Sequence, residues 1–94
     1  MAPALHLLKV RDRNDVARIL EFLFHSHVDL RKLILVYCYL GENVNGLFTN
    51  IVAFYTDLEV QSLESCSPFT SDGYCLISHL KNLSKLNLSD CQVD

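Results

Sequence analysis

Hydrophobic residues follow two different spacings along the chain, and these spacings alternate. Aliphatic residues recur at every second position in short segments that begin near residues 5, 30, 58 and 83. That spacing places alternate side chains on one face of a β-strand. Between these segments the hydrophobic residues recur every three or four positions, which is typical of amphipathic helices. The pattern therefore predicts strands that alternate with helices.

Three helices are expected between the strand segments. Asn14 or Asp15 and Asn43 are the predicted N-caps of the first two, because short polar side chains accept hydrogen bonds from the free amides of a first turn. Ser71 is predicted to cap a shorter third helix that ends near His79. The apolar faces of the first two helices are formed by Val16, Ile19, Leu20, Leu23 and His27, and by Val44, Leu47, Phe48, Ile51, Val52 and Tyr55.

The strand segments share one motif, L-x-x-L-x-L-x-x-C-x-L. Clear copies begin at Leu30, Leu58 and Leu83, and a fainter copy begins at Leu5. The starts are separated by 25, 28 and 25 residues, which lies within the range of stacked repeat proteins. Gln61 is the one polar residue at a leucine position of the clear copies. The regular spacing predicts that the four segments occupy equivalent places in the fold.

Strands that are separated by helices run parallel, and right-handed crossovers place the helices on one face of the sheet. We therefore expect one α/β domain over residues 1–94, a short solenoid with strands on the concave side and helices on the convex side. No helix follows the last strand segment, so the C-terminal end is expected to be uncapped. Exposed Leu83, Leu86 and Leu88 would then favour self-association through this end, or indicate a truncated fragment.

The motif, its period and the cysteine at its turn position resemble the leucine-rich-repeat superfamily, in its ribonuclease-inhibitor-like or cysteine-containing types. The segments Leu63-Glu-Ser-Cys66 and Leu86-Asn-Leu-Ser-Asp-Cys91 are also similar to the repeats of PRAME-type proteins. The resemblance covers residues 28–94 well and residues 5–27 weakly. It implies a protein-interaction module, and the PRAME-type likeness implies part of a substrate receptor in a ubiquitin-ligase assembly.

Composition and charge narrow the class of protein. Half of the residues are hydrophobic, the net charge is −3, and no Lys or Arg lies between Leu33 and Leu80. Nucleic-acid binding needs clustered cations and is disfavoured. No apolar segment is long enough to span a membrane. Lys9 and Arg11 precede any long apolar run, so no signal peptide is predicted, and a cytoplasmic location is expected, with the nucleus as the alternative.

No catalytic or cofactor motif stands out in the sequence. A nucleophile elbow, a glycine-rich phosphate loop and a paired-carboxylate motif are all missing. Cys38, Cys66 and Cys91 recur once per repeat, so they are expected to be buried turn residues, whereas zinc ligands usually come in close pairs. The prediction is a protein that is not an enzyme and holds no cofactor or metal.

The residues between the inward leucines are expected to point to the concave face and to form rows across the strands. Apolar and aromatic side chains on such a face are typical of protein interfaces. We predict a protein partner of unknown identity on this face. The alternative is a repeat fragment with no independent binding activity. The predicted partner-binding residues are Lys32, Ile34, Val36, Tyr37, Val60, Ser62, Glu64, Lys85, Asn87 and Ser89.

Overall fold

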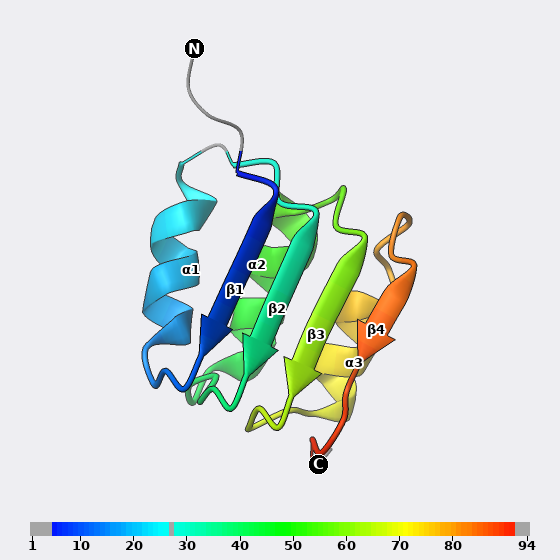
Figure 1. The fold of residues 1–94 in the computed structure, drawn as a ribbon. Helices are drawn as coiled ribbons and strands as arrows, with labels where there is room; N and C mark the ends of the chain where they lie inside the picture. Colours follow the sequence, from blue (N-terminus) through cyan, green and yellow to red (C-terminus); the bar gives the residue numbers. More distant parts are fainter. Residues whose placement is uncertain (1–4, 27, 92–94) are drawn as a thin grey trace.

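A four-stranded parallel sheet with helices on one side forms the framework of the molecule. The computed structural model describes residues 5–26 and 28–91. The strands lie side by side in chain order, and all pair in parallel. Figure 1 shows α2 and α3 behind the sheet and α1 at the edge of the sheet next to β1. The front face of the sheet carries no helix. The predicted α/β class is confirmed. The elements are β1 (Leu7–Arg11), α1 (Val16–Phe24), β2 (Lys32–Val36), α2 (Val44–Phe54), β3 (Val60–Glu64), α3 (Ser71–Ile77) and β4 (Lys85–Asn87).

Equivalent motif positions lie next to one another in the sheet. Leu8 pairs with Leu33, Leu33 with Gln61, and Gln61 with Leu86. Neighbours in a parallel register point to the same face, so this row points toward the helices. The two-residue spacing of the apolar positions thus turns one face of every strand toward the helices.

The core lies between the sheet and the helices. Leu33, Leu35 and Leu63 of the central strands have no exposed surface. The rings of Phe48 and Phe69 meet edge to face, with centroids 5.3 Å apart, beneath α3. The helices complete the core with side chains at their apolar spacing, and its most buried helical members are Val16, Leu20, Phe48, Ile51 and Ile77.

The N-cap positions of α1 and α2 agree with the sequence, although only Asn43 forms the predicted side-chain cap bond. Asn43 caps α2, since its Oδ1 accepts a hydrogen bond from the Gly46 amide at 3.2 Å. Asp15 occupies the N-cap position of α1 without a side-chain cap bond. The cap of α3 is Thr70, which accepts from a first-turn amide at 3.1 Å, so the prediction of Ser71 is wrong by one residue. Thr70 is the cap because its backbone is extended and its side chain accepts the Gly73 amide, whereas Ser71 is already the first residue of the helix.

The first and third helices are shorter than their patterns. α1 ends at Phe24, and α3 ends at Ile77, two residues before His79. His27, which the first helical pattern included, and Val93, at the end of the last motif, lie outside the described residues. The apolar spacing therefore located each helix better than it located the ends.

The last strand is poorly covered. All three residues of β4 are exposed, and Leu86 keeps 37% of its surface exposed although it belongs to the row that points toward the helices. Within the part of the chain that the structure describes, no helix follows β4. Leu83, Leu88 and Cys91 are half-buried. The exposure expected of Leu83, Leu86 and Leu88 is therefore found at Leu86, while Leu83 and Leu88 pack against the core and are partly covered.

Candidate interaction surface

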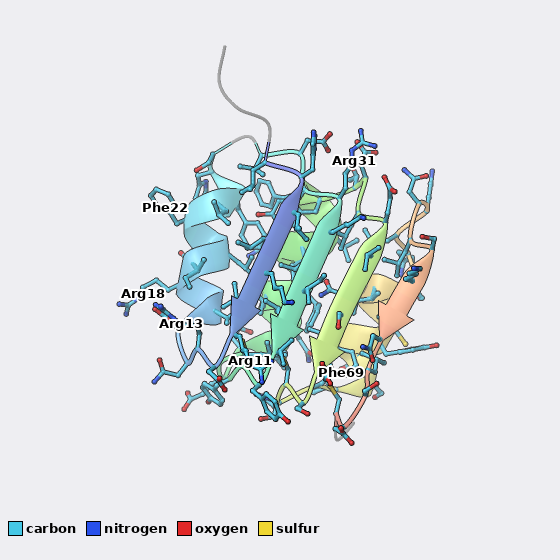
Figure 2. All side chains as sticks on the ribbon, viewed as in Figure 1. Arg11, Arg13, Arg18, Phe22, Arg31 and Phe69 are labelled. Carbon is cyan, nitrogen blue, oxygen red and sulfur yellow. The ribbon has the colours of Figure 1, made fainter. Side chains whose placement is uncertain are left out.

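The strand face, the face of the sheet turned away from the helices, presents three rows of side chains. Each row combines residues that the strand register places side by side. Ser89 follows β4, and its carbonyl accepts a hydrogen bond from the Ser65 amide at 2.8 Å, so it lies next to the third row. Figure 2 shows side chains in front of the strands, with Arg11 near the carboxyl end of β1. The rows are Leu7, Lys32, Val60 and Lys85; Lys9, Ile34, Ser62 and Asn87; and Arg11, Val36 and Glu64.

Two of the predicted residues are covered. Val36 is 5% exposed and Ser62 is 7% exposed, which differs from the expectation that every residue of the rows faces solvent. Val36 lies between Arg11 and Glu64, whose longer side chains stand on either side of it. Ser62 has a short side chain in the middle of the sheet. Both residues therefore contribute little exposed area to the surface. The other predicted residues are half-buried or exposed.

The strand face also includes three residues beyond those predicted. Leu7, Lys9 and Arg11 of β1 are all exposed and extend the three rows by one strand. The faint motif copy at Leu5 could have identified these residues, because each lies 25 positions before its row partner on β2. Lys9 and Arg11 add two positively charged side chains to the surface.

Positive charge is concentrated on the strand face. Lys9, Arg11, Lys32 and Lys85 are exposed there, and Glu64 is the one carboxylate in the three rows. The face thus holds four of the eight Lys and Arg residues and one of the eleven Asp and Glu residues of a chain whose net charge is −3. The strand face is therefore basic on an otherwise acidic molecule.

A residue with a left-handed backbone lies directly after β1, β2 and β3 and three residues after β4. The φ angles are 56° at Asp12, 53° at Tyr37, 54° at Ser65 and 59° at Asp90. This conformation costs an L-residue roughly 1–2 kcal/mol, and it is least usual for a bulky side chain such as that of Tyr37. The turn leaves Tyr37 55% exposed, and the Arg11 guanidinium lies 5.4 Å from the centre of its ring. An aromatic and a cation therefore meet at the carboxyl end of the strand face.

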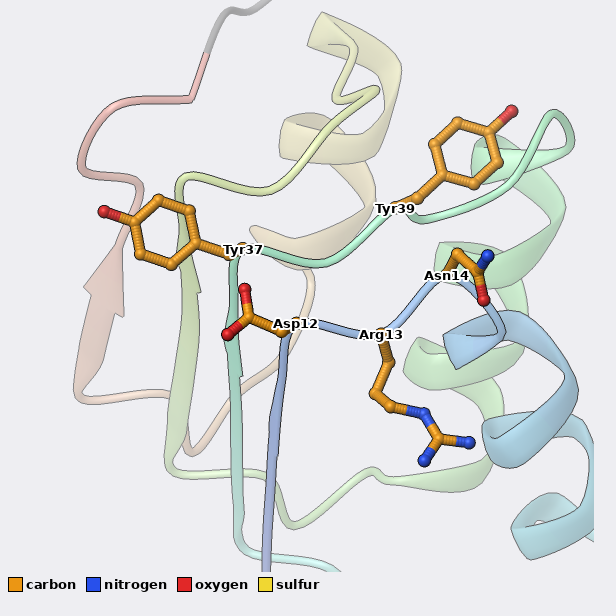
Figure 3. A pocket seen from close by; sticks show the side chains of 5 residues that line it. All are labelled: Asp12, Arg13, Asn14, Tyr37 and Tyr39. Atoms are coloured by element: carbon orange, nitrogen blue, oxygen red, sulfur yellow. The ribbon is translucent and has the colours of Figure 1, made fainter.

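An open depression lies beyond the carboxyl ends of β1 and β2. Its volume is about 420 Å³. Figure 3 shows that the rings of Tyr37 and Tyr39 point away from each other on one segment, while Asp12, Arg13 and Asn14 lie on the segment beside it. The Tyr39 amide donates to the Arg13 carbonyl at 2.9 Å and fixes the two segments together. The depression thus extends the strand face with aromatic side chains.

The Arg13 side chain is committed to an ion pair. Its guanidinium donates to both carboxylate oxygens of Asp15, at 2.9 and 2.7 Å. These hydrogen bonds lower the pKa of Asp15 below its usual value. Arg13 therefore stabilises the turn before α1 and offers little free charge to the depression.

The cysteines of the motif bond to backbone carbonyls of the preceding strand. The thiol of Cys38 donates to the Val10 carbonyl at 3.6 Å, and that of Cys66 donates to the Leu35 carbonyl at 3.3 Å. Cys91 donates in the same way to Leu63, and the three carbonyls belong to register-equivalent residues. Burial raises the pKa of Cys66 to about 11, so its thiol stays protonated at neutral pH. A protonated, hydrogen-bonded thiol is a poor nucleophile and metal ligand.

The described residues hold neither a metal-binding cluster nor a membrane-spanning helix. In residues 5–26 and 28–91, no group of three or more His, Cys, Asp and Glu side chains is placed to hold a metal ion. Across the same ranges, every helix is too short or too polar to cross a bilayer. Comparison with known proteins gave no matching family model and no significant match among curated proteins or solved structures. The geometry of the strand face therefore carries the functional proposal.

Proposed function

We propose that the chain is a short leucine-rich-repeat solenoid segment that binds a protein partner on its strand face, the concave side of the solenoid. The aligned inward row, the left-handed residue after each strand and the cysteine thiols that reach equivalent carbonyls support the repeat. Stacked units of this kind place equivalent residues side by side, as the resemblance to leucine-rich repeats implies.

One observation carries the binding proposal, namely that a parallel sheet leaves one of its faces open. Parallel sheets are generally covered on both faces. Here the strand face exposes apolar and aromatic surface, with Leu7 49% and Tyr37 55% exposed and Ile34 and Val60 half-buried. Tyrosine and arginine are enriched at protein interfaces, and Arg11 and Tyr37 meet at one edge of this face. A protein partner would cover this surface.

The proposal includes no enzyme activity and no cofactor. The tyrosines and basic residues of the strand face are chemically suited to contact a partner, and the motif thiols bond to backbone carbonyls. The likeness to PRAME-type repeats extends the proposal to part of a larger substrate receptor, which would act in the cytoplasm or the nucleus. The sequence shows no adaptor-binding box, so the core of the proposal is the binding of a protein partner.

The exposure of β4 favours a second candidate, a repeat segment without binding activity of its own. Leu86 lies in the inward row, yet 37% of its surface is exposed. Apolar surface of this kind promotes association between chains. In this candidate the strand face has no partner, and changes to its residues have no effect on any interaction.

Partner capture with matched variants separates the two candidates. Ile34→Asp places a charge at the centre of the strand face, and Asn50→Asp places the same charge at an exposed position of α2. We expect Ile34→Asp to abolish capture of the partners that the wild type retains, and Asn50→Asp to keep it, with unchanged circular dichroism in both. Absence of specific capture by the wild type would favour the segment without binding activity, and equal capture by wild type and Ile34→Asp would contradict binding on the strand face.

A further inference from the structure

We infer that the partner segment bound by the strand face is an acidic peptide whose carboxylates flank an aliphatic side chain. The inference rests on the proposed function and adds the chemistry of the ligand. Three lysines surround an apolar spot on this face, and their ammonium groups have no carboxylate partner among the described residues.

The apolar spot is formed by Ile34 and Val60, which are half-buried on adjacent strands. Lys9 is the direct register neighbour of Ile34. Lys32 precedes Ile34 by two residues and pairs with Val60, which pairs in turn with Lys85. Adjacent strands lie about 4.8 Å apart, and alternate residues of one strand lie about 6.6 Å apart. Lysines therefore stand on several sides of the apolar pair, each within reach of a ligand that covers it.

The lysine charges on the strand face are available to a ligand, whereas Arg11 forms an ion pair with Asp12 at 3.5 Å. Among the described residues, no carboxylate lies within 4.0 Å of the ammonium groups of Lys9, Lys32 or Lys85, whereas Arg13 is held by Asp15. Arg31, at the opposite end of the sheet from Arg11 in Figure 2, pairs with Asp29 at 3.4 Å and with Glu59 at 3.2 Å. These arginines are neutralised within the protein, while the lysines of the face are not.

A short acidic peptide fits this surface better than a nucleic acid does. β3 contributes no cation to the rows, and Glu64 interrupts the third row. A nucleic acid requires a continuous track of cations along its backbone. An extended peptide instead presents alternate side chains about 6.6 Å apart on one side, the same spacing that separates Lys9 from Arg11 along β1. Its aliphatic side chain would cover Ile34 and Val60 while its carboxylates meet the lysines.

A series of peptides that differ only in charge tests this inference on the full 94-residue chain. The probes are three fluorescent peptides of the form X-Ser-Leu-Ser-X, in which X is Glu, Gln or Lys, so that the Leu and both X side chains lie on the same side of the extended peptide. Fluorescence anisotropy is expected to show that the Glu peptide binds at least tenfold more tightly than the Gln or Lys peptide. Its affinity should fall as ionic strength rises, because salt screens exposed charges.

Charge-reversal variants and a binding map locate the effect. Lys9→Glu with Lys32→Glu should weaken binding of the Glu peptide at least tenfold. Arg18→Glu with Lys81→Glu makes the same change at exposed positions outside the three rows and should leave the affinity within twofold. Amide chemical shifts in NMR spectra should change around Ile34 when the Glu peptide is added.

The possible failures of the inference and of the proposed function can be told apart. Equal binding of the three peptides, with shifts around Ile34, would overturn the inference and leave the proposed function intact. Tighter binding of a single-stranded RNA of equal charge, lost in the same lysine variants, would overturn it in favour of a nucleic acid. Absence of binding by every peptide would also overturn it, while shifts confined to the helices would contradict both the inference and the proposed function.

Discussion

The second and fourth strands carry the same leucine motif in very different surroundings. Leu33 of β2 has no exposed surface, whereas Leu86 of β4, its equivalent in the register, is 37% exposed. β2 pairs on both sides, and β4 pairs with β3 alone. In the described chain a helix follows β2, and none follows β4. The motif therefore sets the direction in which a side chain points, and the neighbouring elements determine how deeply it is buried.

The largest expected effect compares the same mutation at these two leucines. Leu33→Ala should lower the free energy of unfolding by about 2–5 kcal/mol, because it opens a cavity in a closed core. Leu86→Ala should lower it by about 1 kcal/mol, because that side chain is already partly in water. Urea unfolding followed by circular dichroism measures both values. Equal losses would show that β4 is covered in solution.

Gln61 lies between these two leucines in the register. Its replacement by Leu is expected to increase the stability of the protein. Gln61 has no exposed surface, and its amide donates to the carbonyls of Leu33 at 3.2 Å and Ser62 at 3.4 Å. Its Oε1 has no hydrogen-bond partner among the described residues. Because an unsatisfied buried acceptor costs about 1–3 kcal/mol, Gln61→Leu should raise the free energy of unfolding by a similar amount.

Thermal unfolding is a sufficient check of the Gln61 prediction. A higher melting temperature for Gln61→Leu supports an unsatisfied acceptor in the core. A lower melting temperature would mean that Oε1 is bonded in solution or that the branched side chain does not fit. Lys32→Leu, at an exposed position of the strand face, is the control and should give no comparable gain.

The fold could be predicted from local spacing because both kinds of element bury one face. Leu33 and Leu35 are two residues apart and point inward together, and the helical spacing through Leu47 and Ile51 does the same for α2. Helix ends depend on single hydrogen bonds, and both Thr70 and Ser71 have a side chain able to form the cap bond. The sequence therefore located α3 but misplaced its cap.

The candidate surface was only partly predictable. Spacing identified which residues belong to the strand face, yet Val36 is covered because longer side chains stand beside it on neighbouring strands. Because the first motif copy is faint, Lys9 and Arg11 were not assigned to the strand face. The basic charge of this face was therefore not predicted. The depression beside Tyr39 depends on how two turns pack together, and spacing along the chain does not encode that arrangement.

The buried thiol of Cys66 in the middle of the sheet and the half-buried thiol of Cys91 at its end should contribute differently to stability at alkaline pH. Burial raises the pKa of Cys66 from 9.0 to about 11 and that of Tyr55 from 10.0 to about 12. A raised folded-state pKa stabilises the protein below the unfolded pKa, and this contribution is lost as the pH rises through the folded pKa. Stability should therefore fall between pH 9 and about 12, by about 1–3 kcal/mol for each group.

Denaturant unfolding as a function of pH measures this alkaline loss. Cys66→Ala should remove the part that begins near pH 9. Cys91 lies half-buried beyond β4, and although burial also raises its pKa, Cys91→Ala should leave most of the loss in place. A profile that does not change in Cys66→Ala would contradict the assignment to the buried thiol.

The smallest expected effect is a weak self-association through the exposed side of β4. Sedimentation velocity should show concentration-dependent oligomers of the wild type, and Leu86→Lys should return the chain to a monomer. Leu7→Lys, at the exposed start of β1 on the strand face, is the matched control and should leave association unchanged. A monomeric wild type at every concentration would exclude this contact.

Photo-crosslinking tests most directly the central claim that partners bind the strand face. Tyr37 at the edge of that face is 55% exposed, and Phe22 on α1 is 74% exposed, so either side chain can be replaced by p-benzoylphenylalanine with little effect on the core. We expect the partner to crosslink to the residue that replaces Tyr37 and not to the one that replaces Phe22. A crosslink at position 22 alone would place the interaction on the helical side and contradict the claim.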